Sequence, residues 1–159
     1  MLSELGGDGM RRRVLRQEEE EMSWKEVKTV YAENDGDVLF VDGFEAERIR
    51  ITAMVGATAD NTGLRFSVSE DQYGKFFNAG QFVSTVLMPL MFEVVVIGGY
   101  ALTTLLTPPK SVISPNVTSS VYCGGCSLPS GEQIMKRFRI SSANDKLIAG
   151  SWMKVEVWK

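Results

Sequence analysis

The sequence alternates between apolar and polar residues in several segments after residue 24. In ERIRITAMVG, the apolar residues Ile49, Ile51 and Ala53 are separated by polar ones. LRFSVS, residues 64–69, and the closing segment KVEVW, residues 154–158, show the same alternation. A repeat of two residues is typical of a β-strand that buries one face. We therefore predict strands in all three segments, and a hairpin where the turn TADNTG separates the first two.

Turn signals and strand-like segments follow one another at roughly ten-residue spacing, as in a β-sandwich. ENDG, TADNTG, EDQYGKFFNAG and a stretch rich in Pro, Ser and Gly, residues 107–133, supply the turns. The sequence after residue 24 contains no convincing helix pattern and no internal repeat. These features predict an all-β fold, an antiparallel β-sandwich, over residues 24–159.

The closing strand is expected to pair with an earlier segment, because a terminal strand is normally held inside a sheet. Trp152 and Trp158 are an even number of residues apart, so a strand would place them on the same face. Trp24, at the start of the first predicted strand, is expected to share the core with this strand.

A long apolar run, residues 82–107, meets a crude length test for a transmembrane segment. Glu93 interrupts the run, Pro89 and Gly98-Gly99 would break a helix there, and no Lys or Arg cluster flanks it closely. Two or three buried strands, separated at Pro89 and at Gly98-Gly99, fit these residues better. We therefore expect no membrane contact.

Residues 1–23 differ from the rest and are predicted to form an N-terminal arm. Arg16 precedes Glu19 and Glu20 by a spacing that pairs opposite charges on a helix. Two interpretations remain open: a frayed arm, or an arm that becomes ordered against a neighbouring subunit. The possible interface residues are Arg11, Arg12, Arg13, Arg16 and Trp24.

The composition disfavours several classes of function. The formal net charge is −3 and the pI about 5.1, so the overall charge does not attract nucleic acid. The chain contains no histidine, the commonest general base and a frequent metal ligand. We therefore expect no enzyme activity, no cofactor and no metal. The N-terminal residues lack the apolar core of a secretory signal, so synthesis in the cytoplasm is expected.

CGGC contains the only two cysteines, Cys123 and Cys126. A redox pair of this type normally begins a helix, and a zinc site needs further ligands, which subunits would have to pool across an oligomer axis. We interpret CGGC as two small thiols in a tight surface turn.

SEDQYG resembles an Asp-box turn, in which Asp71 would bind turn amides rather than act in catalysis. Asn116 matches a glycosylation acceptor by chance.

Three arginines are candidate contacts. Arg48, Arg50 and Arg65 would gather on the polar faces of the predicted hairpin. A solvated face is the ordinary explanation, and recognition of an acidic sugar or an acidic partner surface is the alternative. Aromatic residues such as Trp152 and Trp158 would be a sugar-stacking platform in that case, although core packing is the more usual role.

Several of these segments together resemble a known family. Two long segments are similar to small jelly-roll-like structural proteins of tailed bacteriophages: WKEVKTVYAENDGDVLFVDGFEAERIRITAMVGATADNTGLRFSVSEDQYGKFF and the ending RFRISSANDKLIAGSWMKVEVWK, with a variable middle between them. The ending is matched at Leu147, Ile148, Ala149, Gly150, Met153, Val155, Val157 and Trp158. The resemblance extends over the greater part of the chain.

The resemblance implies a jelly-roll-like sandwich and a non-enzymatic virion structural protein. Such a protein would decorate or cement the capsid as a homo-oligomer, with a trimer expected, and its partners would be other virion proteins. A tail or head fibre component with a carbohydrate-binding sandwich, which contacts a host surface glycan, is the alternative. The chain would be made in the host cytoplasm and reside in the virion.

Overall fold

Ten strands form the described part of the chain in the computed structural model, which describes residues 22–60, 62–69, 76–105, 123–142 and 145–159. The strands are β1 (Trp24–Tyr31), β2 (Leu39–Ala46), β3 (Arg48–Val55), β4 (Thr62–Ser67), β5 (Phe76–Val83), β6 (Met88–Ile97), β7 (Tyr100–Leu105), β8 (Cys123–Ser127), β9 (Met135–Ser142) and β10 (Trp152–Trp158). No helix occurs in these ranges. The all-β prediction is therefore confirmed.

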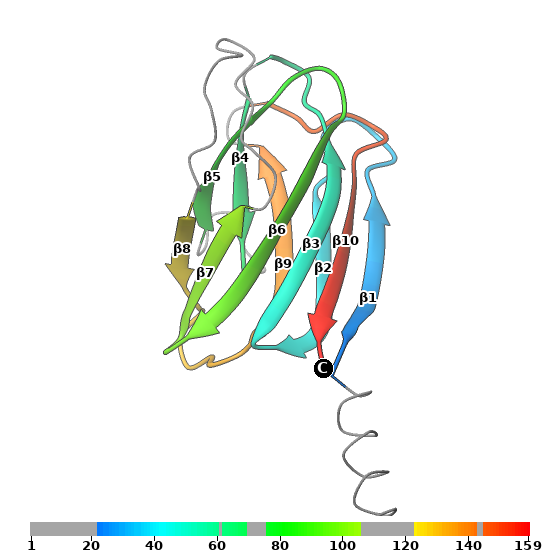
Figure 1. Ribbon diagram of the computed structural model, residues 1–159. Coiled ribbons are helices and arrows are strands. Elements are labelled where there is room, and N and C mark those ends of the chain that lie inside the picture. The colour runs from blue at the N-terminus through cyan, green and yellow to red at the C-terminus, as the bar shows by residue number, and fades with distance from the viewer. Residues whose placement is uncertain (1–21, 61, 70–75, 106–122, 143–144) are drawn as a thin grey trace, which may run out of the picture.

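The strands form two antiparallel sheets that pack face to face (Figure 1). The six-stranded sheet has the order β1-β10-β3-β6-β7-β8, and the four-stranded sheet has the order β2-β9-β4-β5. If β7 and β8 are left aside, every connection crosses between the sheets except the one from β4 to β5, which are neighbours in the four-stranded sheet, and this is the strand order of a jelly roll. The predicted jelly-roll-like sandwich is thus present, and β7 and β8 extend one sheet beyond it.

The core lies between the two sheets and is built from the inward positions of the alternating strands. Ile49, Ile51 and Ala53 are buried, as the alternation predicts. At the centre, Phe66 of the four-stranded sheet stacks on Phe92 of the six-stranded sheet, with ring centroids 4.3 Å apart. Burial of such side chains is the main force that holds the two sheets together.

The closing strand lies between β1 and β3, so the predicted pairing with an earlier segment is confirmed. The backbone N–H of Ser23 donates to the carbonyl of Lys159, and the N–H of Lys159 donates to the carbonyl of Ser23. The prediction that Trp24 shares the core is wrong. A bulge between Glu26 and Lys28 adds one residue, so Val30 faces the core whereas Trp24 faces outward.

The predicted hairpin of residues 48–69 is also wrong. β3 pairs with β10 and β6, whereas β4 lies in the other sheet and pairs with β5 and β9. Alternation along a strand shows which residues face inward, but it does not specify the neighbouring strand. The TADNTG segment therefore crosses from one sheet to the other.

The described part of the long apolar run, residues 82–105, forms strands, as predicted, with a turn at Gly98 and Gly99, whose φ angles are +57° and +78°. Pro89 lies inside β6 instead of between strands. It pairs with Met54 of β3, and β7 pairs with β6 only from Phe92 onward. A missing N–H is tolerated where the second neighbour is absent. Within the described residues, no helix is long and apolar enough to cross a membrane.

Two predicted turns are strands in the structure. FFNAG begins β5, and CGGC forms most of β8, the last strand of the six-stranded sheet. Cys126 is half-buried and packs against the core, so CGGC is not a surface turn. Most of the predicted arm, the Asp-box residue Asp71 and Asn116 lie outside the described residues.

Candidate functional site

The surface of the six-stranded sheet that faces away from the four-stranded sheet carries most of the features that suggest binding. We call this surface the outer face. Its side chains come from every second residue of β10, β3 and β6, because the residues between them are mostly buried in the core. In β1 the bulge interrupts this alternation, and Trp24, Glu26 and Tyr31 lie opposite outer-face residues of β10. Strand pairing brings these side chains into rows that cross the strands.

Three rows carry most of these side chains, and they follow the cross-strand register and, for Trp158 and Arg48, the contact between guanidinium and ring. A fourth row, Thr29, Lys154, Thr52 and Met91, lies between the upper and the charged row. The upper row is Tyr31, Trp152, Met54 and Pro89. The charged row is Glu26, Glu156, Arg50 and Glu93. The lower row is Trp24, Trp158, Arg48 and Val95. The outer face is therefore apolar at one end, charged in the middle and aromatic at the other end.

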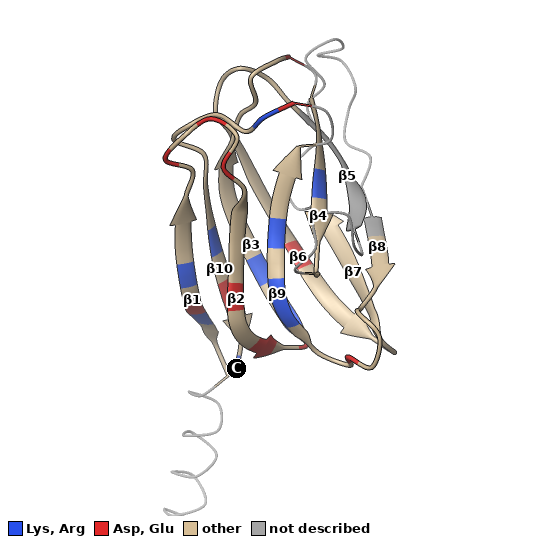
Figure 2. Cartoon of the chain, turned by 180° about the vertical axis from the view of Figure 1, so that it is seen from behind, with Lys and Arg blue, Asp and Glu red and all other residues tan. Residues whose placement is uncertain are grey.

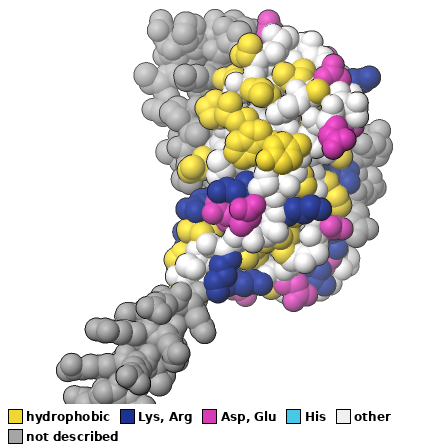
Figure 3. Space-filling model, turned by 90° about the vertical axis from the view of Figure 1, so that its right-hand side faces the viewer, with side chains coloured by type: hydrophobic (Ala, Val, Ile, Leu, Met, Phe, Trp, Pro, Cys, Tyr) yellow, Lys and Arg dark blue, Asp and Glu magenta, His cyan; other side chains and the backbone are white. Residues whose placement is uncertain are grey.

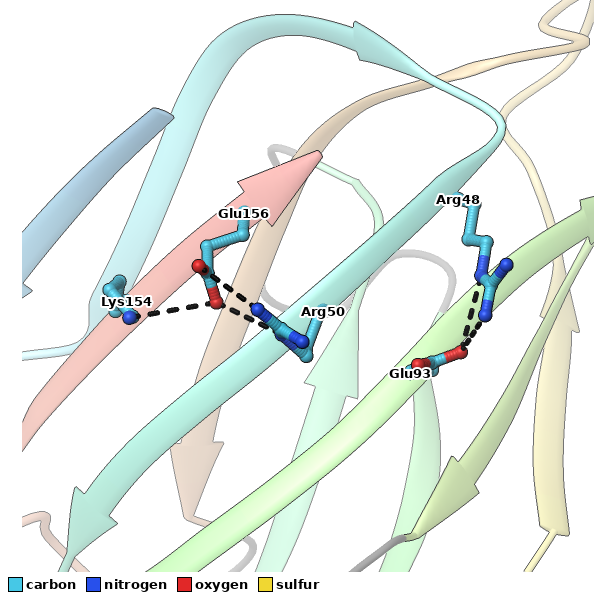
Figure 4. Close-up of polar contacts among 5 residues, drawn as sticks. All are labelled: Arg48, Arg50, Glu93, Lys154 and Glu156. Carbon is cyan, nitrogen blue, oxygen red and sulfur yellow. Dashed lines mark hydrogen bonds and ion pairs between the residues drawn. The ribbon is translucent and has the colours of Figure 1, made fainter. Parts of the chain in front are cut away.

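Ion pairs connect the strands within the outer face (Figure 4). The Arg50 guanidinium donates two hydrogen bonds to Glu156, from Nε to Oε2 at 3.0 Å and from Nη2 to Oε1 at 3.2 Å. Lys154 Nζ lies 3.6 Å from the same Oε2. Arg48 Nη2 lies 2.8 Å from Glu93 Oε2. Two-point contacts of this kind fix the direction of both side chains.

The Glu156 carboxylate is the most strongly influenced of these groups. The hydrogen bonds from Arg50 lower the pKa of Glu156 below its usual value, and the positive charges of Arg50 and Lys154 act in the same direction. Burial raises the pKa, but its effect is smaller than that of the cations. Glu156 therefore remains charged at neutral pH in a largely covered position.

Aromatic rings and arginines stack at the lower row. Trp24 and Trp158 meet edge to face, with centroids 5.2 Å apart and planes at 65°. The Arg48 guanidinium carbon lies 5.2 Å from the Trp24 ring and 5.6 Å from the Trp158 ring, and that of Arg50 lies 4.5 Å from Trp24. These distances are within the range of cation–π attraction. The stack connects the two chain-end strands, β1 and β10, to β3.

The upper end of the outer face exposes large apolar side chains. Tyr31 is 65% exposed and Met91 38% exposed. Val86 and Leu87, in the loop that leads into β6, are 63% and 38% exposed. Seen from the β1 side, hydrophobic side chains gather above a band of charged ones (Figure 3). We call Tyr31, Trp152, Met54, Pro89, Met91, Val86 and Leu87 the apolar end.

The three candidate arginines do not gather. Arg48 and Arg50 lie on the outer face, as their alternation predicts, but Arg65 lies on β4 in the other sheet. From behind, positively charged residues follow β9 and β4 (Figure 2). In the pairing of β4 with β9, Arg65 lies opposite Ser141 and Ser67 lies opposite Arg139. Arg65 and Arg139 are therefore diagonal neighbours on the same face of this sheet. A single arginine patch on one hairpin is therefore ruled out.

Sequence reasoning missed several residues of the outer face. Glu93 was visible only as a charge that interrupts an apolar run, and Tyr31, Met54 and Glu156 were not singled out. The even spacing of Trp152 and Trp158 was a usable signal, since both do lie on one face of β10. Among the described residues, no group of three acidic, cysteine or histidine side chains is placed to hold a metal ion.

Comparison with known proteins gives no relative: no protein-family model matches the chain, and no curated protein matches it.

Proposed function

We propose that this chain is a non-enzymatic structural protein of a bacteriophage virion, which decorates and cements the capsid as an oligomer. The observation that carries the proposal is the jelly-roll sandwich with an apolar end and a charged row on one outer face. Jelly rolls recur in viral capsid proteins. Because one fold serves many functions, the surface has to supply the rest of the argument.

The outer face has the composition of a protein-binding surface. Tyr, Trp, Met and Arg are enriched at the centres of protein interfaces, and all four occur in its three rows. The residues are held by a sheet and by ion pairs, so little side-chain entropy is lost on binding. A rigid surface of this kind suits a subunit that associates with another subunit of the particle in a fixed orientation.

The alternative is a fibre component whose sandwich binds a host glycan. It would use Arg48 and Arg50 for an acidic sugar and the tryptophans for stacking. However, both guanidiniums already bind carboxylates of the same chain, and they lie against the Trp24 ring. Binding a sugar there would have to displace these contacts. The decoration role therefore has the better support.

Immunoelectron microscopy on purified particles of the phage that encodes the chain tests the proposal. Antibodies raised against the purified chain are expected to label the surface of the head. Labelling of the tail or of fibres would favour the alternative. Particles that carry no chain, checked by mass spectrometry of their proteins, would overturn both.

A further inference from the structure

The apolar end exposes large hydrophobic side chains on the surface of a single chain. Tyr31 is 65% exposed although it ends a strand in which Val30 packs against the core. Beside it, Trp152 and Met54 are half-buried, and Pro89 is exposed. A contiguous apolar surface of this kind, bordered by charged residues, usually marks a binding site for another macromolecule.

The order of side chains in each row shows which partner fits. Consider a two-fold axis that runs parallel to the strands, between β10 and β3. Rotation about this axis puts β10 of one copy opposite β3 of the other. In the upper row, Trp152 then meets Met54 of the second copy, and Tyr31 meets Pro89 of the second copy. Apolar side chains face apolar side chains at every position of the row.

The charged row is also complementary to itself under this rotation. Glu156 faces Arg50 of the second copy, so each carboxylate lies between guanidiniums of both chains. Glu93 of each copy faces Glu26 of the other, so the row contains two unfavourable contacts. Glu93 is already bound to Arg48 at 2.8 Å, and this ion pair reduces the repulsion.

The lower row completes the match. Trp158 faces Arg48 of the second copy, a pair that attracts within one chain already, at 5.6 Å from guanidinium carbon to ring centroid. Trp24 faces Val95 of the second copy. In these three rows the rotation pairs apolar, ionic and cation–π partners. In the fourth row, it places Lys154 opposite Thr52 and Thr29 opposite Met91 of the second copy, which adds no ionic or apolar pair.

We propose that two copies of this chain associate through their outer faces about this two-fold axis. The partner is therefore a second copy of this chain. The dimer itself does not depend on the proposed function, and only its location in a virion rests on that function. Such an interface uses the same surface on both subunits and is closed. It predicts a dimer in solution, instead of the trimer that the sequence resemblance implies.

Light scattering during size-exclusion chromatography of the full chain tests the proposal. The wild-type chain is expected to have twice the monomer mass. Met54→Glu places a carboxylate against Trp152 of the second copy, and Trp152→Lys places an ammonium against Met54 of the second copy. Each variant alone is expected to lose the dimer, so its mass halves. An equal mixture is expected to restore the dimer, because the two new charges then face each other.

Two further variants make the test specific. Val38→Glu is the control, since Val38 is an apolar residue of 41% exposure in the loop before β2, away from the outer face. It is expected to remain a dimer. Tyr31→Glu is expected to give a folded monomer, because the Tyr31 side chain is mostly outside the core. Thermal unfolding followed by circular dichroism confirms that each variant is folded.

A wild-type monomer or trimer, or a dimer that survives in folded Tyr31→Glu and Met54→Glu variants, would overturn the proposal. Light scattering measures association of the chain in solution, whereas immunoelectron microscopy and mass spectrometry detect the chain on particles. A monomer that labels the capsid would therefore refute only the two-fold interface. A dimer that is absent from particles would refute only the virion role.

Discussion

Glu156 and Arg50 show how a single pair of side chains joins the strands of this sheet. Glu156 belongs to β10 and Arg50 to β3, and their two hydrogen bonds are 3.0 and 3.2 Å long. Only 12% of the Glu156 side chain is exposed, so its charge depends on Arg50 and, at greater distance, on Lys154. Because the pKa of Glu156 is lowered on folding, the ionised form stabilises the folded state.

We expect Glu156→Gln to lower the free energy of unfolding at neutral pH by about 1.5 kcal/mol, through the loss of a hydrogen-bonded charge. The contribution of Glu156 is fully present above its unfolded pKa, near 4.5, and is lost as the pH falls through the lower folded pKa. The difference between wild type and variant should therefore shrink below pH 4.5. Urea unfolding at a series of pH values and one protein concentration measures it.

Glu45→Gln is the matched control, since Glu45 is an exposed carboxylate on β2 of the other sheet. It is expected to change the free energy of unfolding by less than about 0.5 kcal/mol at any pH. If Glu156→Gln differs from wild type by the same amount at pH 3 as at neutral pH, the lowered pKa of Glu156 does not stabilise the fold.

At the scale of elements, Gly56 shows how tightly the loops pack at the upper end of the sandwich. Its N–H donates to Ser151 Oγ at 3.2 Å, and its carbonyl accepts from the N–H of Ile148 at 3.1 Å. A Cβ added to Gly56 would lie 2.7 Å from Ile148 Cδ1 and 2.9 Å from the carbonyl oxygen of Val86. Gly56 thus allows the β3 end to approach two loops that come from distant parts of the chain.

Gly56→Ala is therefore expected to destabilise the fold by about 2 kcal/mol, because a backbone oxygen cannot move aside as a flexible side chain can. Gly131→Ala is the comparison, with φ of +81° and open space around the added Cβ. It should cost about 1 kcal/mol from backbone strain alone. Urea unfolding of both variants checks the order. An equal or smaller cost for Gly56→Ala would contradict the close packing.

The sequence predicts faces of strands better than it predicts their neighbours. The alternation at Ile49, Ile51 and Ala53 correctly identified the buried side of β3, because burial depends on the strand itself. The choice of β10 and β6 as its partners depends on contacts between segments far apart in the chain, and no local pattern encodes them. For the same reason, the charge of Glu93 acquires a role only once β6 lies beside Arg48.

The residues of the candidate site show the same difference between what one strand determines and what its neighbouring strands determine. Arg48 and Arg50 could be selected from their polar positions on an alternating strand, but Arg65 was grouped with them through the wrong hairpin. The bulge in β1 gave no sequence signal, so Trp24 was assigned to the core although it lies on the outer face. The rows of the outer face are products of register, which became visible only in the folded chain.

At the scale of the whole molecule, β1 and β10 hold both ends of the sandwich domain at one end of the six-stranded sheet (Figure 1). Ser23 and Lys159 exchange backbone hydrogen bonds there, so the domain is closed from Ser23 onward. Residues 1–22 precede this closure, and none of the three rows of the outer face includes them.

A chain that starts at Ser23 is therefore expected to have the same free energy of unfolding in urea as the full chain, within about 0.5 kcal/mol. Its mass in light scattering distinguishes two ways of assembly. If the outer faces associate, the shortened chain remains a dimer, because every paired residue from Trp24 to Trp158 is retained. If Arg11, Arg12, Arg13 and Arg16 mediate assembly, the shortened chain becomes a monomer while Tyr31→Glu in the full chain stays associated. The two variants thus assign assembly either to the sheet or to the arm.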